Sequence, residues 1–145
     1  MKTSIFKSLI AILAITFISC STTPEPIKYG EDSCHFCEMT IVSQVHSAQA
    51  VSTKGKQFKY DAIECMMNDI IKNQTEMAVK RVANFSSPGE MIDVEKAGFI
   101  VNDSINSPMG ENLAAIEIGS NENLYTWSEL KARFLGEDSV TLNSN

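Results

Sequence analysis

One stretch near the middle of the chain, residues 61–73, constrains the fold more than any other feature. Asp61 and Glu64 at its start form the Asp-x-x-Glu pair that caps a helix N-terminus, and Asn73 ends the pattern. Between them, apolar residues recur with the spacing of a single helix face, at Ile63, Met66, Met67, Ile70 and Ile71. The sequence therefore predicts an amphipathic helix whose methionines fill the core.

Strand-like segments lie on both sides of this helix. Residues 39–51 are rich in β-branched and small side chains and predict a strand, with an interruption near Ser43-Gln44. A turn with Gly55 free to take a positive φ leads into a second strand, residues 57–60. Residues 77–83 alternate well enough for a third strand after the helix. These elements predict one ββαβ unit.

The second half of the chain repeats this order more faintly. Thr126 and Glu129 form another capping box, which opens a helix that stops before Gly136. The segments before it are predicted as a connector at 84–95, a strand at 98–102, a loop at 104–112 and a strand at 113–118. We therefore expect an α+β domain of two ββαβ-like units, about 33–83 and 92–136, mostly antiparallel because the hairpin turn is too short for a crossover.

The first 19 residues have the features of an export signal. Lys2 and Lys7 precede an apolar stretch, residues 9–18, that is too short to span a bilayer. Phe17-Ile18-Ser19-Cys20 resembles the lipobox of a bacterial lipoprotein, with Phe17 where Leu is usual. We expect Cys20 to become the lipidated N-terminus and residues 20–32 to form a linker. An ordinary secretory signal is the alternative.

Charge and length narrow the possibilities further. The chain has 12 basic and 18 acidic residues, and loss of Lys2 and Lys7 with the signal would change the net charge from −6 to −8. An acidic balance of this size argues against nucleic acid as a partner and offers no basic patch for anionic lipids. The 126 residues that remain suffice for one domain, 33–136, and residues 137–145 are expected to fray.

Sulfur is the conspicuous chemistry of the mature chain. Three cysteines remain besides Cys20, an odd number that does not suit a simple disulfide framework and indicates a working thiol. The run Cys34-His35-Phe36-Cys37-Glu38-Met39 and the loop Ser107-Pro108-Met109-Gly110 supply thiols and thioethers, which favour Cu(I) over hard cations. If the first segment is extended, Cys37 and Met39 lie on one side of the strand and can bind one ion together.

The spacing of Cys34 and Cys37 has other interpretations. A thioredoxin-like pair needs its first thiol at a helix N-terminus, whereas strand-forming residues follow here. A c-type haem needs His after the second Cys, where this chain has Glu38, and a closed zinc site needs four ligands. A Cys34–Cys37 disulfide stays open, as a structural staple or as the oxidised form of a metal site.

The remaining candidates have plainer predicted roles. Packing is favoured for Cys65, because it lies within the helix, and His46 is expected to be an exposed strand residue. His35 could assist the thiols or be solvated. The other methionines, Met66, Met67, Met77 and Met91, are assigned to packing. No nucleophile is assembled with a base and an orienting group, so enzymatic activity is not expected.

In order and spacing, these motifs resemble the NosL family of accessory lipoproteins of nitrous oxide reductase. The resemblance runs from about residue 33 to 113 and includes residues 34–41, 58–66, 92–97 and 107–110. It implies a fold similar in plan to organomercurial lyase and a periplasmic Cu(I) chaperone that works with a membrane transporter complex to mature the reductase. The copper ligands that it implies are Cys37, Met39 and Met109, and Glu38 stands where the family often has Gly.

We therefore expect a membrane-anchored Cu(I) metallochaperone, with Cys34 and His35 as auxiliary ligand candidates. Ser21 in place of Asp favours sorting to the outer membrane, with the domain facing the periplasm. The alternatives are a periplasmic thiol–disulfide oxidoreductase using Cys34 and Cys37, and a disulfide-stapled structural lipoprotein without metal.

Overall fold

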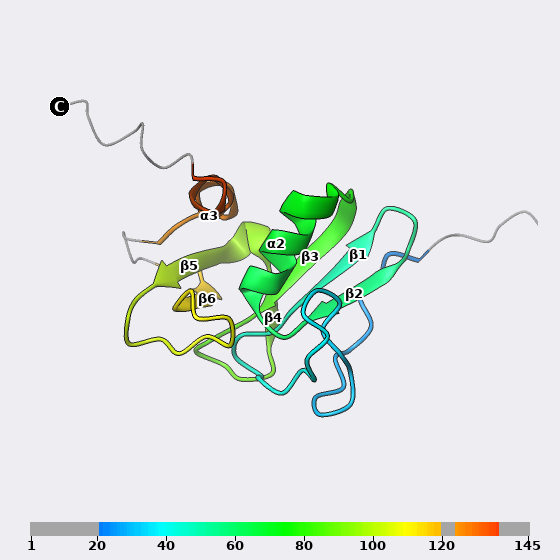
Figure 1. Ribbon diagram of the computed structural model, residues 1–145, viewed down its shortest axis with the longest axis horizontal. Helices are drawn as coiled ribbons and strands as arrows, with labels where there is room; N and C mark the ends of the chain where they lie inside the picture. The colour runs from blue at the N-terminus through cyan, green and yellow to red at the C-terminus, as the bar shows by residue number, and fades with distance from the viewer. Residues whose placement is uncertain (1–20, 120–123, 137–145) are drawn as a thin grey trace, which may run out of the picture.

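The computed structural model describes residues 21–119 and 124–136. In this part the chain forms a four-stranded sheet in the order β2-β1-β3-β4, a two-stranded sheet of β5 and β6, and two longer helices, α2 and α3 (Figure 1). Helix α2 covers one face of the larger sheet, and α3 packs beside β5. The predicted signal peptide, Cys20 and the tail 137–145 lie outside the described residues. None of the described helices has the length and apolar character needed to cross a membrane.

The first unit has the predicted ββαβ order. Strands β1 (Ala48–Ser52) and β2 (Gln57–Tyr60) form an antiparallel hairpin, with Gly55 at a φ of 81° in the turn. Helix α2 (Ile63–Asn73) follows, and β3 (Met77–Ala83) returns antiparallel to β1. The predictions of the helix and of the third strand are thus confirmed.

The prediction of a strand over residues 39–51 is wrong for its first nine residues. Strand β1 begins only at Ala48, and residues 44–46 form a turn. The preceding segment instead closes a small hairpin, in which Ser33 pairs with Thr40 and the Gly30 N–H donates to the Ile41 carbonyl at 2.8 Å. β-Propensity is a weak preference that tertiary contacts override, and here a turn at residues 44–46, close to the predicted interruption, separates the small hairpin from β1.

The predicted capping pair at the start of α2 is also wrong. Ala62 is the N-cap, and no side chain caps the helix. Asp61 instead accepts a hydrogen bond from the Val42 N–H at 3.3 Å, and Glu64 accepts one from the Ser107 hydroxyl. Both carboxyl groups are buried, so distant parts of the chain supply their donors in place of the helix end.

The second unit is simpler than the first. Strand β4 (Met91–Asp93) lies within the predicted connector 84–95 and pairs with β3, so that part of the prediction is wrong. A 3-10 turn, η1 (Val94–Lys96), leads into β5 (Ala97–Val101), which pairs antiparallel with β6 (Leu113–Glu117).

Helix α3 (Trp127–Phe134) begins with the predicted capping box. The Thr126 N–H donates to Glu129 Oε2 at 2.7 Å, and the Glu129 N–H donates to Thr126 Oγ1 at 3.3 Å. Unlike the pair at α2, these residues are exposed, so no buried donor competes for the carboxylate. In the described residues the second unit is a hairpin and a helix.

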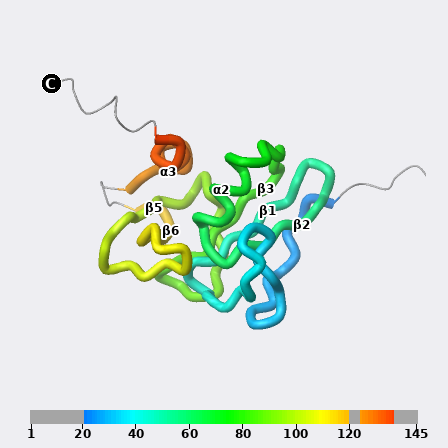
Figure 2. The backbone as a smooth tube through the Cα atoms, in the orientation of Figure 1, coloured from blue at the N-terminus to red at the C-terminus, as the bar shows by residue number. Residues whose placement is uncertain are grey.

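One hydrophobic core joins the two units. It contains Tyr60 and Met66 from the first unit together with Phe99, Leu113 and Leu130 from the second. The backbone trace in Figure 2 shows how β5 and β6 lie against the side of the larger sheet and of α2. The chain is therefore one α+β domain with mostly antiparallel pairing, as predicted.

Candidate metal centre

Three cysteines from two distant segments come together at the start of α2. Cys34 and Cys37 lie in the tip of the hairpin that precedes β1, and Cys65 lies in the first turn of α2. Their three Sγ atoms are all within 4.8 Å of one another, and all three are free thiols. Cys34 and Cys65 are buried and Cys37 is partly exposed, so the group opens to the surface at Cys37.

The hairpin tip is closed by its own backbone. The Cys34 N–H donates to the Met39 carbonyl at 2.8 Å, and the Glu38 N–H donates to the Cys34 carbonyl at 2.9 Å. To make this turn, Glu38 takes a φ of 64°, in the left-handed region that favours glycine. The His35 N–H donates to the Lys59 carbonyl at 2.8 Å, which fixes the tip against β2.

The turn at Glu38 contradicts the extended geometry that was the predicted basis for a shared ion at Cys37 and Met39. The expectation that both side chains leave one face of an extended strand is wrong, because Glu38 between them is left-handed. Met39 instead follows the thiol at a turn and is 54 % exposed. Its thioether is therefore a surface group next to the most accessible of the three thiols.

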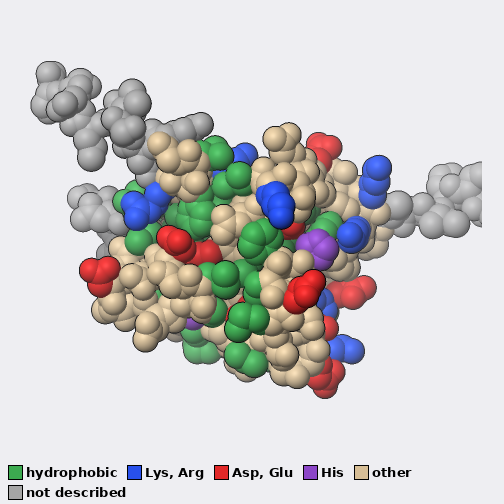
Figure 3. Space-filling view, viewed as in Figure 1, with side chains coloured by type: hydrophobic (Ala, Val, Ile, Leu, Met, Phe, Trp, Pro, Cys, Tyr) green, Lys and Arg blue, Asp and Glu red, His purple; other side chains and the backbone are tan. Residues whose placement is uncertain are grey.

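Met109 lies in a turn between β5 and β6. The Gly110 N–H donates to the Ser107 carbonyl at 3.1 Å, Gly110 has a φ of 82°, and Met109 is 40 % exposed. Figure 3 shows hydrophobic side chains gathered in a band down the middle of one face. The exposed large hydrophobic residues of the described chain include Met39, Val42 and Met109. The Ser107–Glu64 hydrogen bond places this turn beside the first turn of α2, which also carries Cys65.

The three thiols differ in acidity. Hydrogen bonds from the Cys65 thiol and from backbone N–H groups, including that of Cys37, lower the pKa of Cys34 to about 4 against the opposing effect of burial. Its role as donor to Cys34, together with burial, raises the pKa of Cys65. Burial raises the pKa of Cys37. One sulfur of the group is thus prepared as a thiolate, the form that binds soft metals.

Cys65 is the member of the candidate site that sequence reasoning missed. The sequence predicts a packing role for it, and it is fully buried, but its sulfur also completes the thiol group. The available signal was the odd number of cysteines, together with a position in the first turn of a helix that directly follows a hairpin. Helix position alone could not show that this turn faces Cys34 and Cys37.

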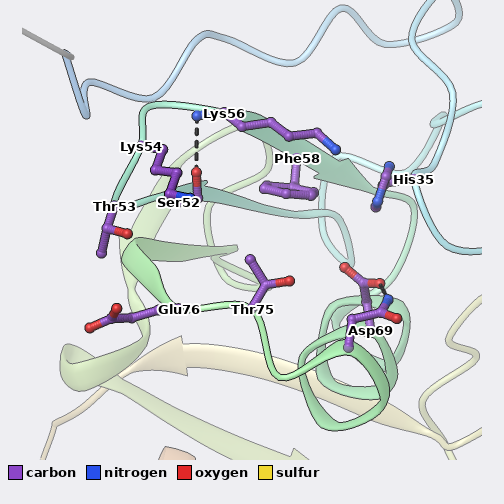
Figure 4. A pocket seen from close by; sticks show the side chains of 10 residues that line it. His35, Ser52, Thr53, Lys54, Lys56, Phe58, Asp69, Thr75 and Glu76 are labelled. Carbon is purple, nitrogen blue, oxygen red and sulfur yellow. Dashed lines mark hydrogen bonds between the residues drawn. The ribbon is translucent and has the colours of Figure 1, made fainter.

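Of the two histidines, His35 fits the predicted alternative of a solvated residue, and only His46 differs from its prediction. His35 is exposed, and its ring packs edge-on against Phe58 with the two ring centroids 4.8 Å apart. It faces a surface groove of about 570 Å³ that Lys56 and Asp69 also line (Figure 4). Among the described residues it does not join the thiol group. His46, expected to be exposed, is buried with Nδ1 3.1 Å from the Leu113 carbonyl, and burial lowers its pKa.

Fold and site together define a small α+β domain with a group of three thiols that could hold a soft metal ion. The family model named NosL matches residues 27–121, and the chain belongs to the NosL family. Among solved structures, it is similar to the crystal structure of the copper chaperone NosL from Shewanella denitrificans, with a TM-score of 0.62. That match has 17 % sequence identity and covers 75 % of this chain and 96 % of the other. No curated protein matches the sequence.

Proposed function

We propose that this chain is a membrane-anchored metallochaperone that binds Cu(I) and delivers it for the maturation of nitrous oxide reductase. The observation that carries the proposal is the group of three free thiols that opens at Cys37 beside an exposed thioether. Such donors suit Cu(I) and are poor ligands for hard cations. Membership of the NosL family, and the copper chaperone among its structural neighbours, support the same cargo.

In this proposal Cys37, Met39 and Met109 hold the ion. Cys37 is the least buried thiol, and both thioethers are at the surface, where a recipient can approach. The hydrogen-bonded Cys34 and Cys65 thiols lie behind Cys37 and act as auxiliary donors. A centre with few ligands and an open side lets a recipient's ligand enter before the old ones leave, which transfer requires.

Delivery would take place at a membrane surface. The lipobox-like sequence ending at Cys20 supports a lipid anchor on the periplasmic side, with the outer membrane favoured by Ser21. The receiving partners would be nitrous oxide reductase and its membrane transporter assembly complex, as the family resemblance implies. The chain itself performs no catalysis in this proposal.

Competition for Cu(I) tests the ligand set. Cys37→Ser and Met109→Ala should each lower the affinity for Cu(I) by about 10-fold or more, measured anaerobically against a chromogenic Cu(I) chelator. Met91→Leu is a matched control, because Met91 is a partly buried methionine on β4. Unchanged affinity in both ligand variants would remove Cys37 and Met109 from the site.

The lowered pKa of Cys34 favours the alternative, a thiol–disulfide oxidoreductase using Cys34 and Cys37. Against it, Cys34 is only 2 % exposed, so a substrate disulfide cannot reach the thiolate without movement of the hairpin tip. Insulin reduction by the metal-free protein separates the two functions. Turnover that survives Met39→Ala and Met109→Ala would favour the oxidoreductase.

A further inference from the structure

We propose that Glu64 is a positioning residue that holds the Met109 turn beside the thiol group, through its hydrogen bond with Ser107. This inference rests on the proposed Cu(I) function and names a residue that acts on the ligand Met109 without itself binding the metal. Neither the helix cap predicted for Glu64 nor a packing role explains the position of its carboxyl group.

Glu64 is a costly residue to bury. Its side chain has no exposed surface, and no salt bridge reaches it within residues 21–119 and 124–136. Its Oε2 atom has no hydrogen-bond partner in that part of the chain, and burial raises its pKa. A buried carboxyl group without a cation destabilises a fold, so a residue of this kind marks a place where position matters more than stability.

The contacts of this carboxyl group are made to the Met109 turn. Glu64 Oε1 accepts a hydrogen bond from the Ser107 hydroxyl, which comes two residues before Met109. The carboxyl group therefore holds the turn at a point two residues before the exposed thioether.

The first turn of α2 connects the Met109 turn to the thiol group. Glu64 and Cys65 are consecutive residues in the first turn of α2, a rigid element, and the Cys65 sulfur lies within 4.8 Å of those of Cys34 and Cys37. Ser107 is itself buried, whereas Met109 two residues away is exposed. Groups that orient metal ligands typically change metal affinity by 10- to 100-fold when they are removed.

A double-mutant cycle tests whether Ser107 and Glu64 act through Met109. Ser107→Ala should weaken Cu(I) binding by about 10-fold in the chelator competition, and Ser107→Thr, which keeps the hydroxyl, should restore most of it. In a Met109→Ala background, Ser107→Ala should cause no further loss, because the turn no longer carries a ligand. Ser104→Ala is the matched control, since Ser104 is exposed in the same loop and, in the described part of the chain, its side chain is hydrogen-bonded to Asn102 and not to α2.

X-ray absorption supplies a readout that a purely structural role would not change. The Cu(I)-loaded Ser107→Ala and Glu64→Leu variants, which lose the donor and the acceptor of this hydrogen bond, should each show one sulfur neighbour fewer than the wild type, with the fold checked by far-UV circular dichroism. Wild-type affinity in Ser107→Ala, or losses that add in the double variant, would overturn the positioning role while leaving the copper function intact. A wild type that binds no Cu(I) would overturn both proposals, whereas an unaffected Met109→Ala would overturn the positioning role and remove Met109 from the ligand set.

Discussion

Cys34, Cys37 and Cys65 differ in the hydrogen bonds that reach their sulfur atoms. Cys34 accepts from a neighbouring thiol and from backbone N–H groups, whereas Cys65 donates and Cys37 is mainly affected by burial. At neutral pH in the metal-free protein, the lowered pKa of Cys34 favours its thiolate, and the raised pKa of Cys37 favours its thiol. Cu(I) binding through Cys37 should release a proton.

The hydrogen bond from Cys65 can be tested by titration. Cys65→Ala removes the largest single cause of the lowered pKa of Cys34, so that pKa should rise from about 4 towards the ordinary thiol value. The pH dependence of thiolate absorbance near 240 nm in the metal-free protein measures this shift. Cys65→Ser keeps a donor of similar size and should titrate nearer the wild type, whereas identical curves for wild type and Cys65→Ala would contradict the assignment.

At the scale of elements, the hairpin tip that holds Cys34 and Cys37 has one unfavourable backbone position. Glu38 takes a left-handed conformation in which an L side chain meets its own carbonyl oxygen, at a cost of about 1–2 kcal/mol that glycine avoids. The family resemblance implies that Gly often stands at this position, and Gly suits the same turn. We therefore expect the tip to keep its backbone geometry with either residue.

Glu38→Gly should therefore raise the free energy of unfolding by up to about 1 kcal/mol, after the greater freedom of glycine in the unfolded chain is deducted. Urea unfolding followed by circular dichroism measures the change. Glu31→Gly is the control, because Glu31 is exposed and lacks a positive φ, so glycine should only destabilise there. A destabilised Glu38→Gly would mean that the side chain of Glu38, not its backbone, matters.

An element could be predicted from the sequence when the residues that determine it are close together along the chain. Helix α2, strand β3 and the capping box of α3 depend on residues close in sequence, so periodicity and spacing located them. Strand β4 pairs with β3, and the tip of the hairpin before β1 is fixed by the hydrogen bond from the His35 N–H to the Lys59 carbonyl, so local propensity misplaced both segments. The roles of Asp61 and Glu64 were wrong for the same reason, since their donors lie on other loops.

For the site, the sequence indicated a soft metal centre and two of its three clustered thiols. Residue type carried that inference, because thiols near one another in sequence are near in space whatever the fold. Cys65 needed the packing of α2 against the hairpin tip, which no local pattern contains. The ligand roles of Met39 and Met109 stay predictions, which the Cu(I) competition tests.

At the scale of the whole molecule, the described domain begins close to the expected anchor. Gln57 on β2 holds the linker at two points: its Oε1 accepts from the Glu25 N–H at 3.1 Å, and its Nε2 donates to the Thr23 carbonyl at 3.0 Å. Lys59 donates to the Pro26 carbonyl at 3.0 Å. The first residues of the predicted linker thus lie along β2, and Thr23 comes only three residues after the predicted lipidation site Cys20.

Removal of the anchor should therefore change location without changing the metal site. Cys20→Ser should move the protein from the membrane fraction to the soluble periplasmic fraction, because no acyl chain can then be attached. The Cu(I) affinity of the released protein should equal that of the anchored form. All residues of the hydrophobic core, and the three cysteines of the thiol group, lie within the range 27–134 and do not include Cys20. Ser21→Ala, one residue away, is the control and should stay with the membrane. A Cys20→Ser protein that remains in the membrane fraction would show that something other than a lipid at this cysteine holds it there.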